Sequence, residues 1–161
     1  MTDLEKKYHR DITNPLKYKL FLISKLPSLW FWGVSLTELS VHRCTCSMKL
    51  KWQNQNPFGS MYFSALNGAA ELSTGILLQL ALSQYPKYSM LVTNFKAEFF
   101  KKSVGTLQFT CSDGEDLRAT IAAIVANPEK KGSFVLKSMA IDEHGVTTAQ
   151  FEVGWSIMIK V

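Results

Sequence analysis

One carboxylate lies in the middle of the most apolar stretch of this sequence. Glu71 is preceded by alanine and followed by leucine, within the apolar run 61–82. Removing a carboxylate from water raises its pKa and is unfavourable unless a partner compensates the charge. Such an acid is either matched by a specific partner or kept for chemistry, as a general base or a nucleophile. Glu71 is therefore the first candidate catalytic residue.

A second group of residues with chemical potential comes just before the helix that this run predicts. It is the segment Asn56-Pro57-Phe58-Gly59-Ser60-Met61-Tyr62-Phe63. At a helix start, the backbone N–H groups around Gly59 to Phe63 lack helical partners and meet the positive end of the helix dipole. Donors of this kind stabilise an oxyanion. Because Glu71 would lie about 13 to 18 Å further along the helix axis, one chain does not easily join the donors to the acid.

Both positions also have a structural interpretation. Glu71 would then be held by a lysine, arginine or serine of a sheet at a subunit interface. Asn56 would be a turn residue, because asparagine followed by proline is common in turns and Pro57 comes next. The sequence leaves these alternatives open.

No metal site and no disulfide framework are predicted. His42, Cys44 and Cys46 alternate along a probable strand and share one face, but neighbouring positions on one strand rarely converge on one ion. Cys111 is remote from them. An odd total of three cysteines without CxxC spacing argues against a disulfide framework.

Length and composition are those of one globular domain over residues 1–161. The chain is 47% hydrophobic and 19% charged, which excludes a disordered chain. The run around Glu71 also contains Asn67 and Gln79, so it indicates a buried helix and no transmembrane segment. Because the first residues contain no apolar signal sequence, we expect a cytoplasmic protein.

The net charge of +5 is unevenly distributed. Residues 1–60 contain nine Lys and Arg against four Asp and Glu, whereas the rest of the chain contains nine of each. This excess indicates either a solvated helix face or attraction of phosphates or an acidic surface. No block of basic residues alternates with aromatics, so no nucleic-acid partner is predicted.

The elements that must position these residues follow from periodicity and breakers. A helix is predicted over 13–26, where Asn14-Pro15 suits its start and Pro27 its end. The cluster Trp30-Phe31-Trp32 that follows is interpreted as a plug over the core, or alternatively as a membrane-contacting patch. Residues 34–52 predict one bent strand or a pair. Further strands are predicted at 89–100, 104–112, 132–142 and 146–159, with an outer helix at 115–127.

A long apolar helix wrapped by an antiparallel sheet resembles the hotdog fold, an α+β architecture. The helix start sharpens the resemblance to hotdog thioesterases of the phenylacetyl-CoA thioesterase type. Those have an asparagine, a glycine three residues later, Ser or Thr, then His-Gly-Gly, and an acid fifteen residues after the asparagine. Here Asn56, Gly59, Ser60 and Glu71 match, whereas Tyr62 stands at the histidine position and Phe63-Ser64 at the two glycines. The chain thus resembles an uncharacterised branch, a domain of unknown function with an added N-terminal helix and outer helix.

This resemblance implies hydrolysis of an acyl-CoA or acyl-carrier thioester. Glu71 would be the general base or nucleophile, and Asn56 would orient water or hold the loop. The backbone at Gly59 and the Tyr62 hydroxyl would donate hydrogen bonds to the thioester carbonyl. The substrate would also contact Ser60, Met61, Phe63 and Trp32. Coenzyme A would enter as part of the substrate, with no other cofactor. A homodimer, or a tetramer built from it, would bring the helix start of one subunit beside the acid of the other.

Two other classes remain at this stage. A non-catalytic acyl-CoA or fatty-acyl binding protein would keep the acyl tunnel but lack the oxyanion site, because the His-Gly-Gly is missing. Hotdog dehydratases use a histidine with an acid, and here no histidine lies between His42 and His144. The sequence therefore favours hydrolysis or binding over dehydration.

Overall fold

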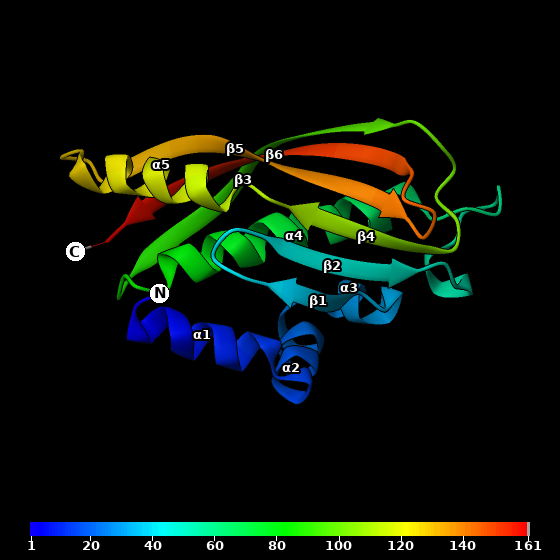
Figure 1. Cartoon of the computed structure of the whole chain (residues 1–161), viewed down its shortest axis with the longest axis horizontal. Helices are drawn as coiled ribbons and strands as arrows, with labels where there is room; N and C mark the ends of the chain where they lie inside the picture. Colours follow the sequence, from blue (N-terminus) through cyan, green and yellow to red (C-terminus); the bar gives the residue numbers. More distant parts are fainter. Residues whose placement is uncertain (161) are drawn as a thin grey trace.

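The computed structural model describes residues 1–160 as one long helix wrapped by an antiparallel sheet, with helices on the remaining side (Figure 1). The sheet has six strands in the order β1-β2-β4-β5-β6-β3. The helices are α1 (Asp3–Thr13), α2 (Pro15–Lys25), α3 (Pro27–Trp32), α4 (Phe63–Leu82) and α5 (Gly114–Ala126), with a 3-10 turn η1 (Trp52–Asn54). The strands are β1 (Ser35–Leu39), β2 (Cys44–Lys49), β3 (Tyr88–Phe99), β4 (Thr106–Cys111), β5 (Lys131–Asp142) and β6 (Thr147–Ile159). The α+β class predicted from the sequence is confirmed.

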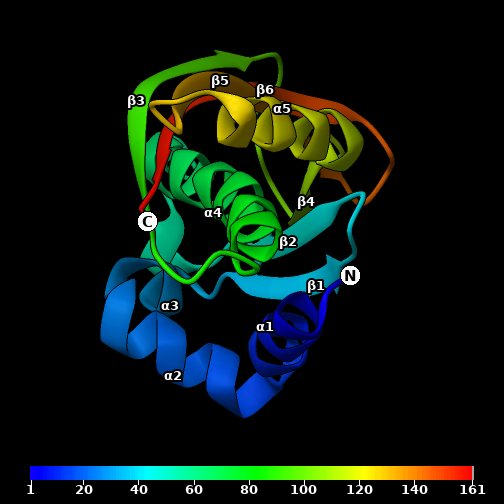
Figure 2. The same ribbon diagram turned by 90° about the vertical axis from the view of Figure 1, so that its left-hand side faces the viewer.

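The central helix α4 forms the core. Fourteen of its twenty residues are buried, because it contacts β2, β4, β5 and β6 while α1 and α3 cover it from the other side. Figure 2 shows the sheet curving round α4. Among residues 1–160, α4 is the one helix long and apolar enough to cross a membrane, and most of it is buried inside the protein. This agrees with the predicted buried helix.

The N-terminal part contains two helices more than the sequence indicated, α1 and the short α3. The helix α1 begins with a capping box between Thr2 and Glu5, and its Tyr8 hydroxyl donates a hydrogen bond to Oε1 of Gln79 in α4. Glu5 is buried and pairs with Arg118 of α5 at 2.8 Å. The next helix, α2, starts at the predicted cap, Asn14, and ends before the predicted stop. These contacts attach α1 to both α4 and α5.

The aromatic cluster after α2 is only partly a plug. It forms the short helix α3, in which Trp30 and Phe31 are exposed while Trp32 packs against the core. The plug interpretation is therefore wrong for Trp30 and Phe31. The segment that follows is the predicted pair of strands, β1 and β2, joined antiparallel.

One edge of the sheet, that of β3, has backbone groups free to pair with another strand. Within residues 1–160, β1 and β3 are the edge strands, and β3 pairs with β6 alone. Its other edge carries unpaired backbone groups over a strand of twelve residues.

The three cysteines are free and buried, and residues 1–160 contain no cluster of three potential metal-ligating side chains.

Candidate active site

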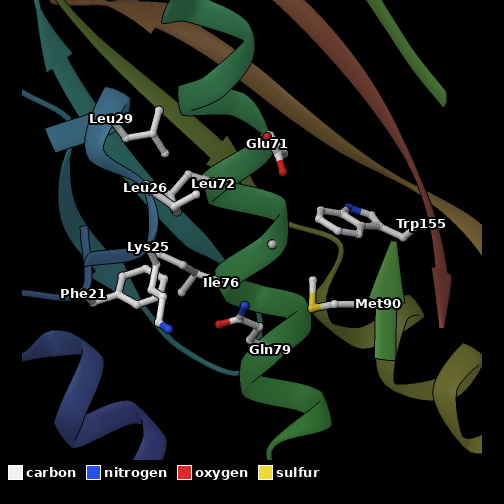
Figure 3. A pocket seen from close by; sticks show the side chains of 11 residues that line it. Phe21, Lys25, Leu26, Leu29, Glu71, Leu72, Ile76, Gln79, Met90 and Trp155 are labelled. Atoms are coloured by element: carbon white, nitrogen blue, oxygen red, sulfur yellow. The ribbon is translucent and has the colours of Figure 1, made fainter. Parts of the chain in front are cut away.

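Glu71 is exposed in the single chain, contrary to the expectation of a buried acid. It lies where two neighbouring cavities meet along α4. The first cavity, of about 410 Å³, is lined by Phe21, Lys25, Leu26, Leu29, Glu71, Leu72, Gly75, Ile76, Gln79, Met90 and Trp155. The second, of about 480 Å³, is lined by Lys25, Leu26, Pro27, Ser28, Leu29, Trp32, Ser64, Asn67, Gly68, Glu71 and Phe95. Figure 3 shows Trp155 and Met90 on one side of α4 and the side chains of α2 and α3 on the other. The sheet therefore does not close over this part of the helix.

The Glu71 carboxylate has no structural partner within the chain. Among residues 1–160 it makes no ion pair and accepts no hydrogen bond. The apolar walls of the two cavities reduce its hydration, which raises the pKa of the carboxyl above its ordinary value. The structural alternative, an acid held by a lysine, arginine or serine of a sheet at a subunit interface, stays a prediction, because such a partner would come from a second subunit. An unpaired carboxylate with a raised pKa is a stronger base than an ordinary glutamate, which suits it to act as a general base.

Sequence reasoning missed the polar stripe to which Glu71 belongs. Asn67, Glu71, Gly75 and Gln79 follow one another at intervals of four, so they share one face of α4. The side-chain oxygen of Asn67 is buried without a hydrogen-bond partner, and Gln79 is fixed by the Tyr8 hydroxyl at 2.8 Å. The spacing of polar and small residues within an otherwise apolar helix was the signal that would have found them.

At the start of α4, the Asn56 side chain holds the loop. Its amide nitrogen donates to Ser60 Oγ at 3.0 Å and to the Met61 carbonyl at 3.1 Å. Its oxygen accepts from the Phe58 backbone N–H at 2.9 Å and from the Ser60 backbone N–H at 3.3 Å. Gly59 turns the loop with a φ of 73°, a conformation that favours glycine. Of the two predicted tasks for Asn56, the geometry supports holding the loop.

Fewer backbone donors are free here than the sequence suggested. The N–H groups of residues 59–62 bond to Asn56, to the Ser103 carbonyl and to the Asn54 carbonyl, so the expectation of free donors is wrong for those four. The backbone N–H groups of Ala65 and Leu66 donate hydrogen bonds to the Tyr62 carbonyl. The N–H groups of Phe63 and Ser64 have no partner among residues 1–160. Two neighbouring amides at an uncapped helix start can stabilise an oxyanion.

A third cavity of about 370 Å³ borders this helix start. It is lined by Asn56, Ser60, Met61, Phe63, Leu66, Phe99, Phe100, Lys101, Lys102 and Ser103. Gly59 and Tyr62 are exposed beside it, and the Tyr62 ring packs edge-on against that of Phe63. Lys101 pairs with Asp142 at 3.2 Å. The cavity therefore has both aromatic and lysine side chains in its lining.

The predicted site residues fall into two groups in one chain. Asn56, Ser60, Met61 and Phe63 share the third cavity, whereas Trp32 shares the second cavity with Glu71. Glu71 lies eight positions after Phe63 in α4, which amounts to about 12 Å along the axis. The chain alone thus keeps the free amides and the carboxylate apart.

Comparison with solved structures finds the same fold in several bacterial proteins. A Pseudomonas aeruginosa protein of unknown function, described as a probable thioesterase, is 21% identical with a TM-score of 0.74, covering 91% of this chain and 97% of that one. A thioesterase from Haemophilus influenzae is 11% identical with a TM-score of 0.67, covering 87% and 88%. The Escherichia coli PaaI protein of the phenylacetic acid degradation operon is 15% identical with a TM-score of 0.67, covering 98% and 97%. At these identities the similarity shows the fold alone.

The family is shown by sequence. No protein of curated function matches the chain. The family model described as "Domain of unknown function (DUF4442)" matches residues 18–157, which span α2 to β6 and include both halves of the candidate site. The sheet order, the wrapped helix and these structural neighbours confirm the hotdog fold that the helix-start motif suggested. The chain therefore belongs to the DUF4442 family and adopts the hotdog fold.

Proposed function

We propose that the protein hydrolyses an acyl thioester in a site shared between two subunits. The observation that carries the proposal is Glu71, an unpaired carboxylate at the junction of two cavities. Structural acids are normally paired or fully hydrated, whereas this one is set among apolar walls that raise its pKa. The fold shared with proteins described as thioesterases supports the same reaction class.

The first cavity suits the acyl group. Its walls are mainly apolar, including Leu72, Ile76 and Trp155, and it extends from Glu71 to Gln79. These two residues are about 12 Å apart along α4, which accommodates an acyl chain of medium length. Gln79, at the far end, accepts a hydrogen bond from the Tyr8 hydroxyl of α1. Chain length would therefore be limited by α1 and α4 together.

A twofold dimer would supply the missing half of the site. The open edge of β3 can pair antiparallel with the same strand of a second copy, which would extend the sheet. Phe63, Phe99 and Phe100 are exposed around the third cavity and would gain cover from such pairing. The start of α4 in one subunit would then face Glu71 of the other.

The chemistry needs no group beyond water. The Glu71 carboxylate takes a proton from water as the water oxygen bonds to the thioester carbon. The Phe63 and Ser64 amides of the second subunit donate hydrogen bonds to the resulting oxyanion. When the carbon–sulfur bond breaks, the thiolate takes the proton back from Glu71, and the products are a carboxylic acid and a thiol. Glu71 acts as a general base in this sequence.

A second candidate is an acyl-CoA binder without turnover. Two observations favour it. The Asn56 amide has its hydrogen bonds committed to the loop, so it has little capacity left to orient a water molecule. Phe63 and Ser64 also bring side chains to the amides that would meet the carbonyl, where they narrow the approach.

The deciding experiment combines turnover with binding. The purified protein is screened with acyl-CoA esters of graded chain length, thiol release is followed, and affinity is measured on the Glu71→Gln variant by calorimetry. We expect turnover by the wild type and binding without turnover by the variant. The matched control is Glu129→Gln, an exposed acid on the loop after α5, which should keep full activity. Binding without thiol release by the wild type would favour the binder, and a monomer in light scattering would overturn the shared site.

A further inference from the structure

The helix α2 is apolar on two opposite faces. Tyr18 and Leu22 point into the protein and are buried. Leu16, Leu20 and Ile23 are spaced by four and three residues, so they lie within about 60° of each other on the outer side of the helix. Their exposed fractions lie between 42% and 67%. A helix with a second apolar stripe in water indicates a surface that another apolar phase covers.

Lysines border this outer stripe. Lys17 and Lys19 project on either side of it, and both are exposed. Lys17 pairs with Asp11 at 2.6 Å, whereas Lys19 makes no ion pair with residues 1–160. Residues 14–33 contain three lysines and no acid. The stripe is therefore set in a positively charged surface.

The next helix, α3, carries further exposed apolar side chains beside α2. α3 packs against α2, and both lie on the side of the molecule opposite α5 and β5 (Figure 2). In α3, Trp30 and Phe31 are 45% and 46% exposed, and Phe31 stacks edge-on with exposed Trp52 at 5.8 Å. The Lys51 ammonium lies beside Gly33 at the end of α3. Exposed tryptophan next to lysine is typical of side chains at the boundary between lipid and water.

We propose that the outer face of α2 and α3 binds an anionic lipid bilayer. The apolar stripe and the two aromatics would enter the headgroup region, and Lys19 and Lys51 would meet lipid phosphates. Each lysine near such a surface contributes about 1 kcal/mol, or about fivefold in affinity. The two cavities that meet at Glu71 are lined by residues of these helices and of α4, so acyl chains held in the bilayer would be close to them.

Charge favours a bilayer over a second copy of this chain. Two copies facing each other through α2 would bring lysines together, since residues 14–33 offer no acid to pair with them. An anionic bilayer supplies the opposite charge over its whole area. Of the two occupants, the bilayer satisfies both the apolar stripe and its basic border.

The test uses the full-length protein and vesicle flotation. Vesicles of phosphatidylcholine mixed with phosphatidylglycerol should bring the protein to the top of the gradient, pure phosphatidylcholine vesicles should bind it far less, and 1 M salt should release it. The variant Leu20→Ser with Ile23→Ser should lose at least about tenfold in partitioning. Lys19→Gln and Lys51→Gln should each lose about fivefold.

Matched controls lie on the opposite side of the molecule. Val135→Ser with Val146→Ser removes two exposed apolar side chains, and Lys130→Gln with Lys131→Gln removes two charges; both should float like the wild type. Circular dichroism verifies that the variants fold. Flotation independent of lipid charge, equal losses in the controls, or no binding to any vesicle would overturn the proposal. So would an oligomer that Leu20→Ser with Ile23→Ser dissociates while vesicles leave the wild type unbound. None of these readouts depends on thioester turnover.

Discussion

The two halves of the candidate site differ in how their polar groups are used. At the start of α4, the Asn56 side chain bonds to Phe58, Ser60 and Met61 and fixes a tight loop. About 12 Å along the same helix, the Glu71 carboxylate makes no hydrogen bond and no ion pair with residues 1–160. A committed polar group stabilises the fold, whereas an uncommitted one is available to a ligand. Stability and activity should therefore separate between the two positions.

The largest expected effect comes from Glu71→Gln. Loss of the general base should lower thioester turnover at least about 100-fold. The free energy of unfolding should stay the same or rise, because the amide removes a carboxylate that its surroundings disfavour. Thiol release and urea denaturation measure the two quantities. A variant that keeps its turnover would remove Glu71 from the mechanism.

Asn56→Ala should show the opposite pattern. Loss of the loop hydrogen bonds should lower the free energy of unfolding by about 2–3 kcal/mol. The control is Asn14→Ala, which removes the cap of α2 and its two hydrogen bonds and should lower stability by about 1 kcal/mol. Urea denaturation of both variants checks the difference. Equal losses in the free energy of unfolding would mean that the Asn56 side chain stabilises the fold no more than an ordinary helix cap does.

Two glycines of α4 test how closely the neighbouring side chains pack against this helix beside the two cavities. A methyl group at Gly75 would meet the Trp155 ring at 3.5 Å, an ordinary contact, so Gly75→Ala should raise stability by about 0.5–1 kcal/mol. It should also narrow the acyl cavity and shift the preferred chain length downward. A methyl group at Gly68 would lie 2.8 Å from Leu29, so Gly68→Ala should give no such gain. Thermal unfolding and the chain-length profile distinguish the two, and equal gains would show that α3 moves freely.

The smallest effect is the pH dependence that Glu71 gives to turnover and to the free energy of unfolding. Its pKa is raised by loss of hydration, so turnover should fall on acidification at a higher pH than an ordinary glutamate would cause. In that same interval the folded state binds more protons than the unfolded one, and stability should decline as pH rises. Glu71→Gln should abolish that decline. Rate and unfolding profiles of both proteins check this, and a rate profile with the midpoint of an ordinary glutamate would contradict the raised pKa.

Several features were predictable because they depend on residues close in sequence. The apolar run that ends at Leu82 predicts the length of α4, and Asn14-Pro15 predicts the start of α2. The strands were predicted within a few residues by alternation and turn residues. Local periodicity carries this information without reference to packing. The order of the predicted elements, one long apolar helix and an antiparallel sheet, resembled the hotdog fold, and the motif from Asn56 to Glu71 sharpened that resemblance to a known type of thioesterase.

Other features were decided by segments distant in sequence. Glu71 is exposed because the sheet does not close over the middle of α4 and α2 and α3 leave cavities there, which an apolar run cannot reveal. Trp30 and Phe31 face water although Trp32 does not, because the position of α3 on α4 selects which aromatic packs. The order of the strands leaves β3 at an edge. A sequence records which side chains are apolar or charged, but exposure depends on the surfaces that the rest of the chain brings to them.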